Sequence, residues 1–172
     1  MPTIERPDPS EYAEYYGTYI DKVPDGPFLE MLRQQHEETQ AFLSELGEAR
    51  GEYRYAAGKW SVKEVVGHMT DTERVFAYRG LCFARGDEGP LPGMDQDPYV
   101  EQAHFEDRTL ADIAAEWQDL RRSDLRLFGS FRPEVWSRGG VASGCRFTVR
   151  SIAYIVLGHE IHHLGVLRDR YL

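Results

Sequence analysis

The sequence predicts an all-α protein that folds as a four-helix bundle. Apolar residues recur at intervals of three and four in four separate stretches of the chain, and this is the period of an amphipathic helix. Ser61 and Thr109 stand directly before two of these stretches, where a hydroxyl group can cap the first turn of a helix. The stretches are separated by segments rich in glycine, proline and acidic residues, which are typical of loops.

Each helix follows from its own pattern. We expect helices over residues 27–47, 62–84, 109–128 and 148–168. The second has the clearest start, because Glu64 lies three residues after Ser61 and completes a capping box. A short hairpin is expected around residues 135–145, in a connector rich in glycine, arginine and serine.

The chain is expected to hold one bundle domain over residues 27–172. An extended arm over residues 1–26 precedes it, with several prolines and tyrosines and no helical period. A helix of 22 residues is about 33 Å long. A connector of roughly 24 residues, at up to 3.3 Å each, can return along that length. We therefore expect an up-down-down-up order with a long crossover between the second and third helices.

Composition narrows the classes of partner and compartment. The chain has 20 Lys and Arg against 29 Asp and Glu, a net charge of −9, which argues against binding to nucleic acid or to anionic membranes. No stretch approaches about 18 consecutive apolar residues, so no membrane span is expected. The N-terminus lacks the apolar run of a signal peptide, and Cys82 and Cys145 have no CxxC spacing. We expect a cytoplasmic protein.

Two histidines of the fourth helix suggest a metal site. Steps of about 100° per residue place His159 and His163 at the centre of the apolar stripe that faces the core. Such a pair, at i and i+4, can direct two imidazoles at one metal ion. Core histidines that are satisfied by polar neighbours are an equally good explanation, since a buried imidazole needs such partners.

The segment from His159 to His163 also satisfies H-E-x-x-H, the zinc-peptidase pattern in which the glutamate, here Glu160, is the general base. That scheme takes its third ligand from later in the chain, and little sequence follows His163. We therefore disfavour a peptidase and look for a third ligand upstream.

The second helix offers His68, on the flank of its apolar stripe. Asp71 lies one turn further and could orient the His68 ring by accepting a hydrogen bond. Glu73 falls inside the stripe, where an unpaired carboxylate would be costly. Both acids are candidates for supporting the metal ligands. Ion pairs, for instance with Arg74 or with a neighbouring helix, would also explain them.

Three short motifs together resemble the DinB family of metalloenzymes, which includes the YfiT-like proteins. They are Lys59-Trp60-Ser61-Val62, His68-x-x-Asp71-x-Glu73 and Gly158-His159-x-x-x-His163. The resemblance covers about residues 27–170 and implies a bundle of up-down-down-up topology. It also implies a divalent metal ion, zinc or nickel, held by one histidine of the second helix and two of the fourth. In this chain those residues are His68, His159 and His163.

The resemblance also implies a range of functions. Three neutral imidazoles leave a fourth position on zinc open, as in catalytic sites. Characterised relatives transfer low-molecular-weight thiols such as bacillithiol, so the leading hypothesis is a metal-dependent thiol S-transferase that acts on a small-molecule thiol and an electrophile. A metal-dependent hydrolase that activates water is the alternative enzyme. A metal-binding stress-response protein without catalysis is the third hypothesis.

Family members are often dimers, and the fourth helix has a second apolar face at Leu157, Ile161 and Leu164. We expect a homodimer through this face, which the N-terminal arm could cover instead. Three further residues near the second helix could meet an anionic substrate, and salt bridges would explain them as well: Tyr78, Arg79 and Arg85.

Overall fold

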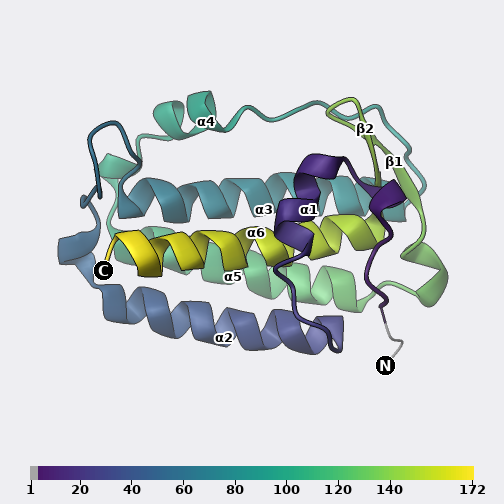
Figure 1. Ribbon diagram of the computed structural model, residues 1–172, viewed down its shortest axis with the longest axis horizontal. Helices are drawn as coiled ribbons and strands as arrows, with labels where there is room; N and C mark the ends of the chain where they lie inside the picture. Colours follow the sequence, from purple (N-terminus) through teal and green to yellow (C-terminus); the bar gives the residue numbers. More distant parts are fainter. Residues whose placement is uncertain (1–3) are drawn as a thin grey trace.

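Four long helices form the body of the molecule (Figure 1). The computed structural model describes residues 4–172, and within them the long helices are α2 (Phe28–Leu46), α3 (Val62–Ala84), α5 (Leu110–Gly129) and α6 (Val149–Arg170). Helix α3 packs against both α5 and α6, and α2 packs against α5. The four expected helices are confirmed, with small differences at their ends.

The remaining elements are short. They comprise the helices α1 (Gly17–Ile20) and α4 (Gln96–Ala103), and an antiparallel hairpin of β1 (Gly139–Ala142) and β2 (Cys145–Thr148). Single 3₁₀ turns cover Pro9–Glu11, Glu14–Tyr16, Glu48–Arg50, Phe105–Asp107 and Pro133–Val135. The hairpin lies close to where a short one was expected, so the protein is mostly helical rather than all-α.

Side-chain caps mark the start of three of the long helices, α3, α5 and α6. The Ser61 hydroxyl accepts a hydrogen bond from the Glu64 amide at 3.2 Å, and the Glu64 carboxylate accepts one from the Ser61 amide, which confirms the capping box. Thr109 accepts from the amide of Asp112 at 3.1 Å. Thr148 caps α6 in the same way. These bonds satisfy backbone amides that have no partner inside a helix.

The core consists of two apolar clusters with a buried polar layer between them. One cluster surrounds Phe83 and Phe128, and the other surrounds Val66 and Trp117. Between the two clusters each long helix contributes a buried polar side chain, namely Thr39, Glu73, Arg121 and Glu160. Charged groups at such a place need internal partners, because burial removes them from bulk solvent.

Over the described residues 4–26, the N-terminal arm differs from the extended segment that was expected over residues 1–26, of which residues 1–3 lie outside the described part of the chain. Residues 17–20 form the helix α1, which lies against α6 (Figure 1). The contact is so close that a Cβ on Gly158 would lie 2.1 Å from the carbonyl oxygen of Tyr19. The arm is also tied to the start of α6, where Arg150 and Thr148 donate hydrogen bonds to Glu11. These contacts hold α1 against α6. Because α1 is too short to show a helical repeat of apolar residues, the sequence pattern does not predict it.

The connection between α3 and α5 contains α4, although residues 85–108 were expected to be a loop throughout. It passes from the hairpin along the outside of α3 before it enters α5 (Figure 1). Helix α4 buries only Val100, so no amphipathic period marks it. Asp95 caps it by accepting a hydrogen bond from the amide of Asp97.

Within residues 4–172, every helix is too short or too polar to cross a membrane.

Candidate metal centre

Three histidines from two helices meet beside the polar layer. The Nε2 atom of His159 lies 3.2 Å from Nε2 of His68 and 3.1 Å from Nε2 of His163. One ring nitrogen of each histidine lies within 4.8 Å of those of the other two. The packing of α3 against α6 therefore brings together the three residues that the sequence selected as ligands.

The spacing of these nitrogens fits a bound metal ion. Imidazole nitrogens lie about 2.0–2.1 Å from zinc in tetrahedral sites, which places two such ligands roughly 3.3 Å apart. The two observed separations are close to this value. The donor set has neither thiolate nor carboxylate, and imidazole donors suit zinc, nickel, copper and iron.

Burial keeps the three imidazoles in the form that binds metals. It lowers the pKa of His68 to about 4. Burial, together with the nearby His68 and His162, lowers the pKa of His163 to about 3. The pKa of His159 is also well below its usual value, again because of burial and the neighbouring histidines. At neutral pH all three rings are uncharged and each offers a nitrogen lone pair.

Neighbouring side chains determine how the histidine rings lie. The Thr72 hydroxyl, one turn along α3, is 3.4 Å from Nδ1 of His68. The ring of Trp60 lies against His68, with centroids 4.8 Å apart, and the ring of Tyr19 lies against His159 at 5.1 Å. Tyr19 belongs to the arm, whose part in the site the sequence did not indicate, because the arm matches none of the three motifs.

The structure does not bring Asp71 to His68. The Asp71 carboxylate lies 3.5 Å from Arg74, the ion pair that was considered as the other explanation. The residue at i+4, Thr72, lies where Asp71 was a candidate, because side chains at i and i+4 lie above each other on a helix. Burial raises the pKa of Asp71, with the positive charge of Arg74 acting against it.

Glu73 is buried as expected, but it belongs to the polar layer. Its carboxylate accepts two hydrogen bonds from Arg121 of α5, at 2.6 and 2.8 Å, which is the ion pair with a neighbouring helix that was left open. Arg121 also donates to Glu160, and Thr39 donates to Glu160 from α2. Glu160 therefore pairs inside the bundle, which agrees with the rejection of the peptidase pattern.

Arg121 and Asp124 were not among the residues predicted from the sequence. Both lie on the buried face of α5, at i+4 and i+7 from Trp117, so their spacing carried a signal. Burial and the neighbouring Glu73 raise the pKa of Asp124 to about 8. Arg121 supplies the positive charge of the layer.

Two cavities reach the histidines from the surface. One, of about 310 Å³, is lined by His68 and His159 together with Tyr19 and Arg79. The other, of about 520 Å³, is lined by His163, among others. A ligand in either cavity could approach the nitrogens, as a catalytic metal site requires.

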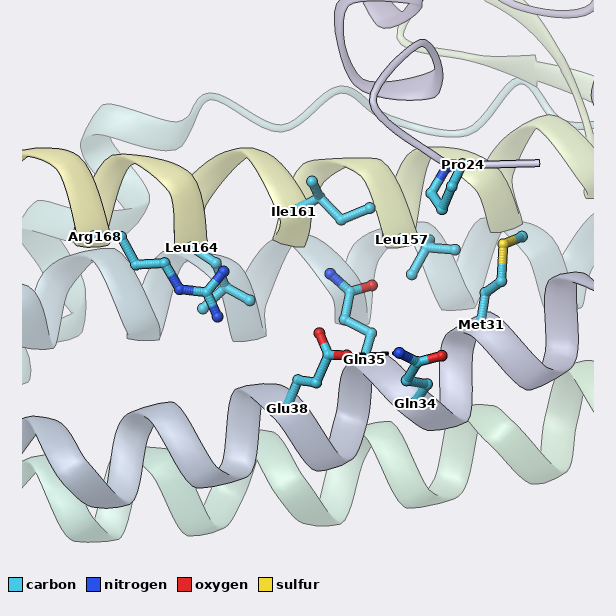
Figure 2. Close-up of a pocket in the computed structure, with 9 residues that line it drawn as sticks. All are labelled: Pro24, Met31, Gln34, Gln35, Glu38, Leu157, Ile161, Leu164 and Arg168. Carbon is cyan, nitrogen blue, oxygen red and sulfur yellow. Dashed lines mark hydrogen bonds between the residues drawn. The ribbon is translucent and has the colours of Figure 1, made fainter. Parts of the chain in front are cut away.

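A third, mostly apolar groove lies between α2 and α6 (Figure 2). Its α6 wall includes Leu157, Ile161 and Leu164, the face expected to bind a second copy or the arm. Leu157 and Leu164 are buried in the bundle, and Pro24 of the arm reaches the groove. None of the three histidines lines this groove, so it is separate from the candidate metal centre.

The comparisons with known proteins show the family and the fold of the chain. The model of a family described as the DinB superfamily matches residues 31–167. No curated protein matches the chain. A similar solved structure is YfiT from Bacillus subtilis, described as a probable metal-dependent hydrolase with an unusual four-helix bundle topology. The two share 17% sequence identity over 96% of this chain and 90% of that one, with a TM-score of 0.71, which shows a common fold.

Proposed function

Because the chain belongs to the DinB superfamily, we propose that it is a metal-dependent hydrolase whose divalent ion is held by His68, His159 and His163. The observation that carries the proposal is the convergence of three uncharged imidazoles, of which His68 and His159 are buried and His163 is half-buried, beside two cavities. Zinc or nickel is the ion that we infer. A divalent ion at such a site lowers the pKa of bound water and polarises a carbonyl group.

The chain contributes position and environment to this reaction. Thr72 and Trp60 orient the His68 ring, and Tyr19 supports His159. Burial keeps the ligands neutral and keeps protons from competing for their nitrogens. Three protein ligands leave a place for water or substrate, which is the arrangement of catalytic zinc sites. The proposal includes the up-down-down-up order, in which the connection through α4 follows α3 back to the start of α5.

Metal content and ester hydrolysis test the proposal together. Untagged protein is stripped with chelator and reloaded with Zn²⁺ or Ni²⁺, and the metal per chain is measured by mass spectrometry. We expect about one ion per chain in the parent and little in His163→Ala. The control is His104→Ala, because His104 is exposed. Loaded parent protein should hydrolyse p-nitrophenyl esters faster than either stripped protein or the His163→Ala variant.

Failure of the parent to bind either ion would overturn the metal site. One equivalent of metal without hydrolysis of esters or amides would remove the hydrolase and leave the non-catalytic metal-binding protein. The thiol S-transferase expected from the family resemblance stays a prediction, because no described contact favours a thiol over water. The same assay, repeated with a low-molecular-weight thiol and an electrophile, tests it by the appearance of the conjugate.

The expected homodimer also stays a prediction. Light scattering at several protein concentrations measures the mass in solution. A mass of one chain at every concentration would rule the dimer out.

A further inference from the structure

Among the described residues, Arg79 is a buried cation without an anionic partner. It lies on α3 and is 2% exposed. Its Nη2 atom donates to the carbonyl oxygen of Pro92 at 2.8 Å and to the Ser143 hydroxyl at 3.0 Å, and both acceptors are neutral. In the part of the chain that the structure describes, no carboxylate lies within ion-pair distance of Arg79, whereas Arg121 and Arg150 both have one. Burying an unpaired charge is costly, so a role for it is expected.

The side chain of Arg79 lines the cavity of about 310 Å³ that also contains His68 and His159. His68, Thr72, Phe76 and Arg79 follow one another on one face of α3, at spacings of three and four residues. The first and last of them are separated by about 16 Å along the helix axis. The cavity thus has two ligating histidines toward one end and a guanidinium toward the other.

The hairpin and the connection to α4 hold the guanidinium in place. Ser143, at the tip of the hairpin, has a left-handed backbone with φ of 53°, which is unfavourable for a residue other than glycine. Its amide donates to the carbonyl oxygen of Leu91 at 3.1 Å, and this bond fixes the tip beside Pro92. A guanidinium has five N–H donors, so donors remain for a ligand.

The walls near Arg79 favour an organic anion. The ring of Phe76 lies under the guanidinium, with its centroid 5.0 Å from Cζ, and Tyr16 lines the same cavity. One carboxylate, that of Asp95, also lines it. A single negative charge next to hydrocarbon therefore fits this cavity better than the double charge of a phosphate ester.

We propose that Arg79 binds the carboxylate of a small organic acid whose other end lies at the histidines. The placement of the other end of the acid at the histidines rests on the proposed function. The binding of the carboxylate rests on Arg79 and its cavity alone. The ligand class is thus a carboxylate with an apolar segment, and Arg79 selects it over neutral analogues.

The test compares 3-phenylpropanoate with its neutral amide by calorimetric titration. Stripped protein is used with chelator present, so the result does not depend on metal binding or hydrolysis. Charged hydrogen bonds of this kind correspond to about 10- to 100-fold in affinity, and we expect the acid to bind more tightly than the amide by that factor. Arg79→Gln should bind both equally. Arg126→Gln removes an exposed arginine of α5 and should retain the preference.

Parent protein that binds both probes equally, or binds neither, overturns the proposal, as does an Arg79→Gln variant that keeps the preference. Tighter binding of phenyl phosphate than of the acid overturns the choice of a carboxylate. Circular dichroism checks that Arg79→Gln folds. If it does not fold, Ser143→Ala keeps the guanidinium but removes one of its two hydrogen bonds, and an unchanged preference in that variant contradicts the arrangement. Acid preference in stripped protein that shows no hydrolysis when loaded would reject the proposed function alone.

Discussion

The charged layer in the middle of the bundle allows a quantitative prediction for Arg121→Met. Arg121 is fully buried and is the cation that pairs with Glu73 and Glu160, whose side chains are 4% and 3% exposed. Methionine fills much of the same space but leaves two carboxylates without a counter-ion. Breaking a buried ion pair costs about 3–5 kcal/mol, and here one cation serves two anions, so we expect the upper part of that range. For a chain of this size the change corresponds to a fall in Tm of roughly 10–20 °C.

Urea denaturation followed by circular dichroism, in chelator at pH 7, measures the free energy of unfolding without a contribution from bound metal. The matched control is Arg126→Met, an exposed position on the same helix. A triple variant with Arg121→Met, Glu73→Gln and Glu160→Gln should recover much of the loss, because neutral amides need no cation. A loss below about 1 kcal/mol in the single variant, or a triple variant no more stable than the single one, would refute the reasoning.

Three further predictions concern the pH dependence of stability and the arm. Because burial and Glu73 raise the pKa of Asp124 to about 8, the folded protein keeps a proton that the unfolded chain releases above about pH 4. The stability from this group is complete below that pH and is lost as the pH rises towards 8. Asp124→Asn should therefore make the fall in unfolding free energy between pH 5 and 8 shallower, by up to about 1.4 kcal/mol per pH unit, and parallel urea curves would contradict this. Gly158→Ala places a Cβ against the Tyr19 carbonyl and should destabilise the folded protein by about 1–3 kcal/mol in thermal melts. As the control, Gly165→Ala places a Cβ where nothing lies within 4 Å and should stabilise the folded protein by about 0.5–1 kcal/mol. A Gly158→Ala protein that melts like the parent would exclude the close contact. Burial alone would raise the pKa of Glu11, but hydrogen bonds from Arg150 and Thr148 outweigh burial and lower this pKa, so the contribution of Glu11 to the docking of the arm is lost as the pH falls through the lowered pKa. Glu11→Gln should therefore speed hydrogen exchange in residues 4–26 at neutral pH. Unchanged exchange would count against the role of Glu11 as an anchor of the arm.

The sequence alone determined where the long helices lie and which histidines are candidate metal ligands. Apolar periods and the caps at Ser61 and Thr109 are local signals, and they depend on residues three or four positions apart. The metal-ligand set was selected from short motifs, and the packing of α3 on α6 then brought the three Nε2 atoms together. Binding of a metal ion there remains a prediction.

Only the tertiary structure decided the partners of the charged residues. Glu73 could be placed on the buried face of its helix from sequence, but its partner Arg121 is 48 residues away, and no local pattern joins the two. Asp71 could have been placed either at His68 or in an ion pair with Arg74; the structure shows the ion pair, and Thr72 lies at His68 instead. The helices α1 and α4 and the environment of Arg79 were likewise decided by packing between distant segments, because short elements and single buried charges leave no period in the sequence.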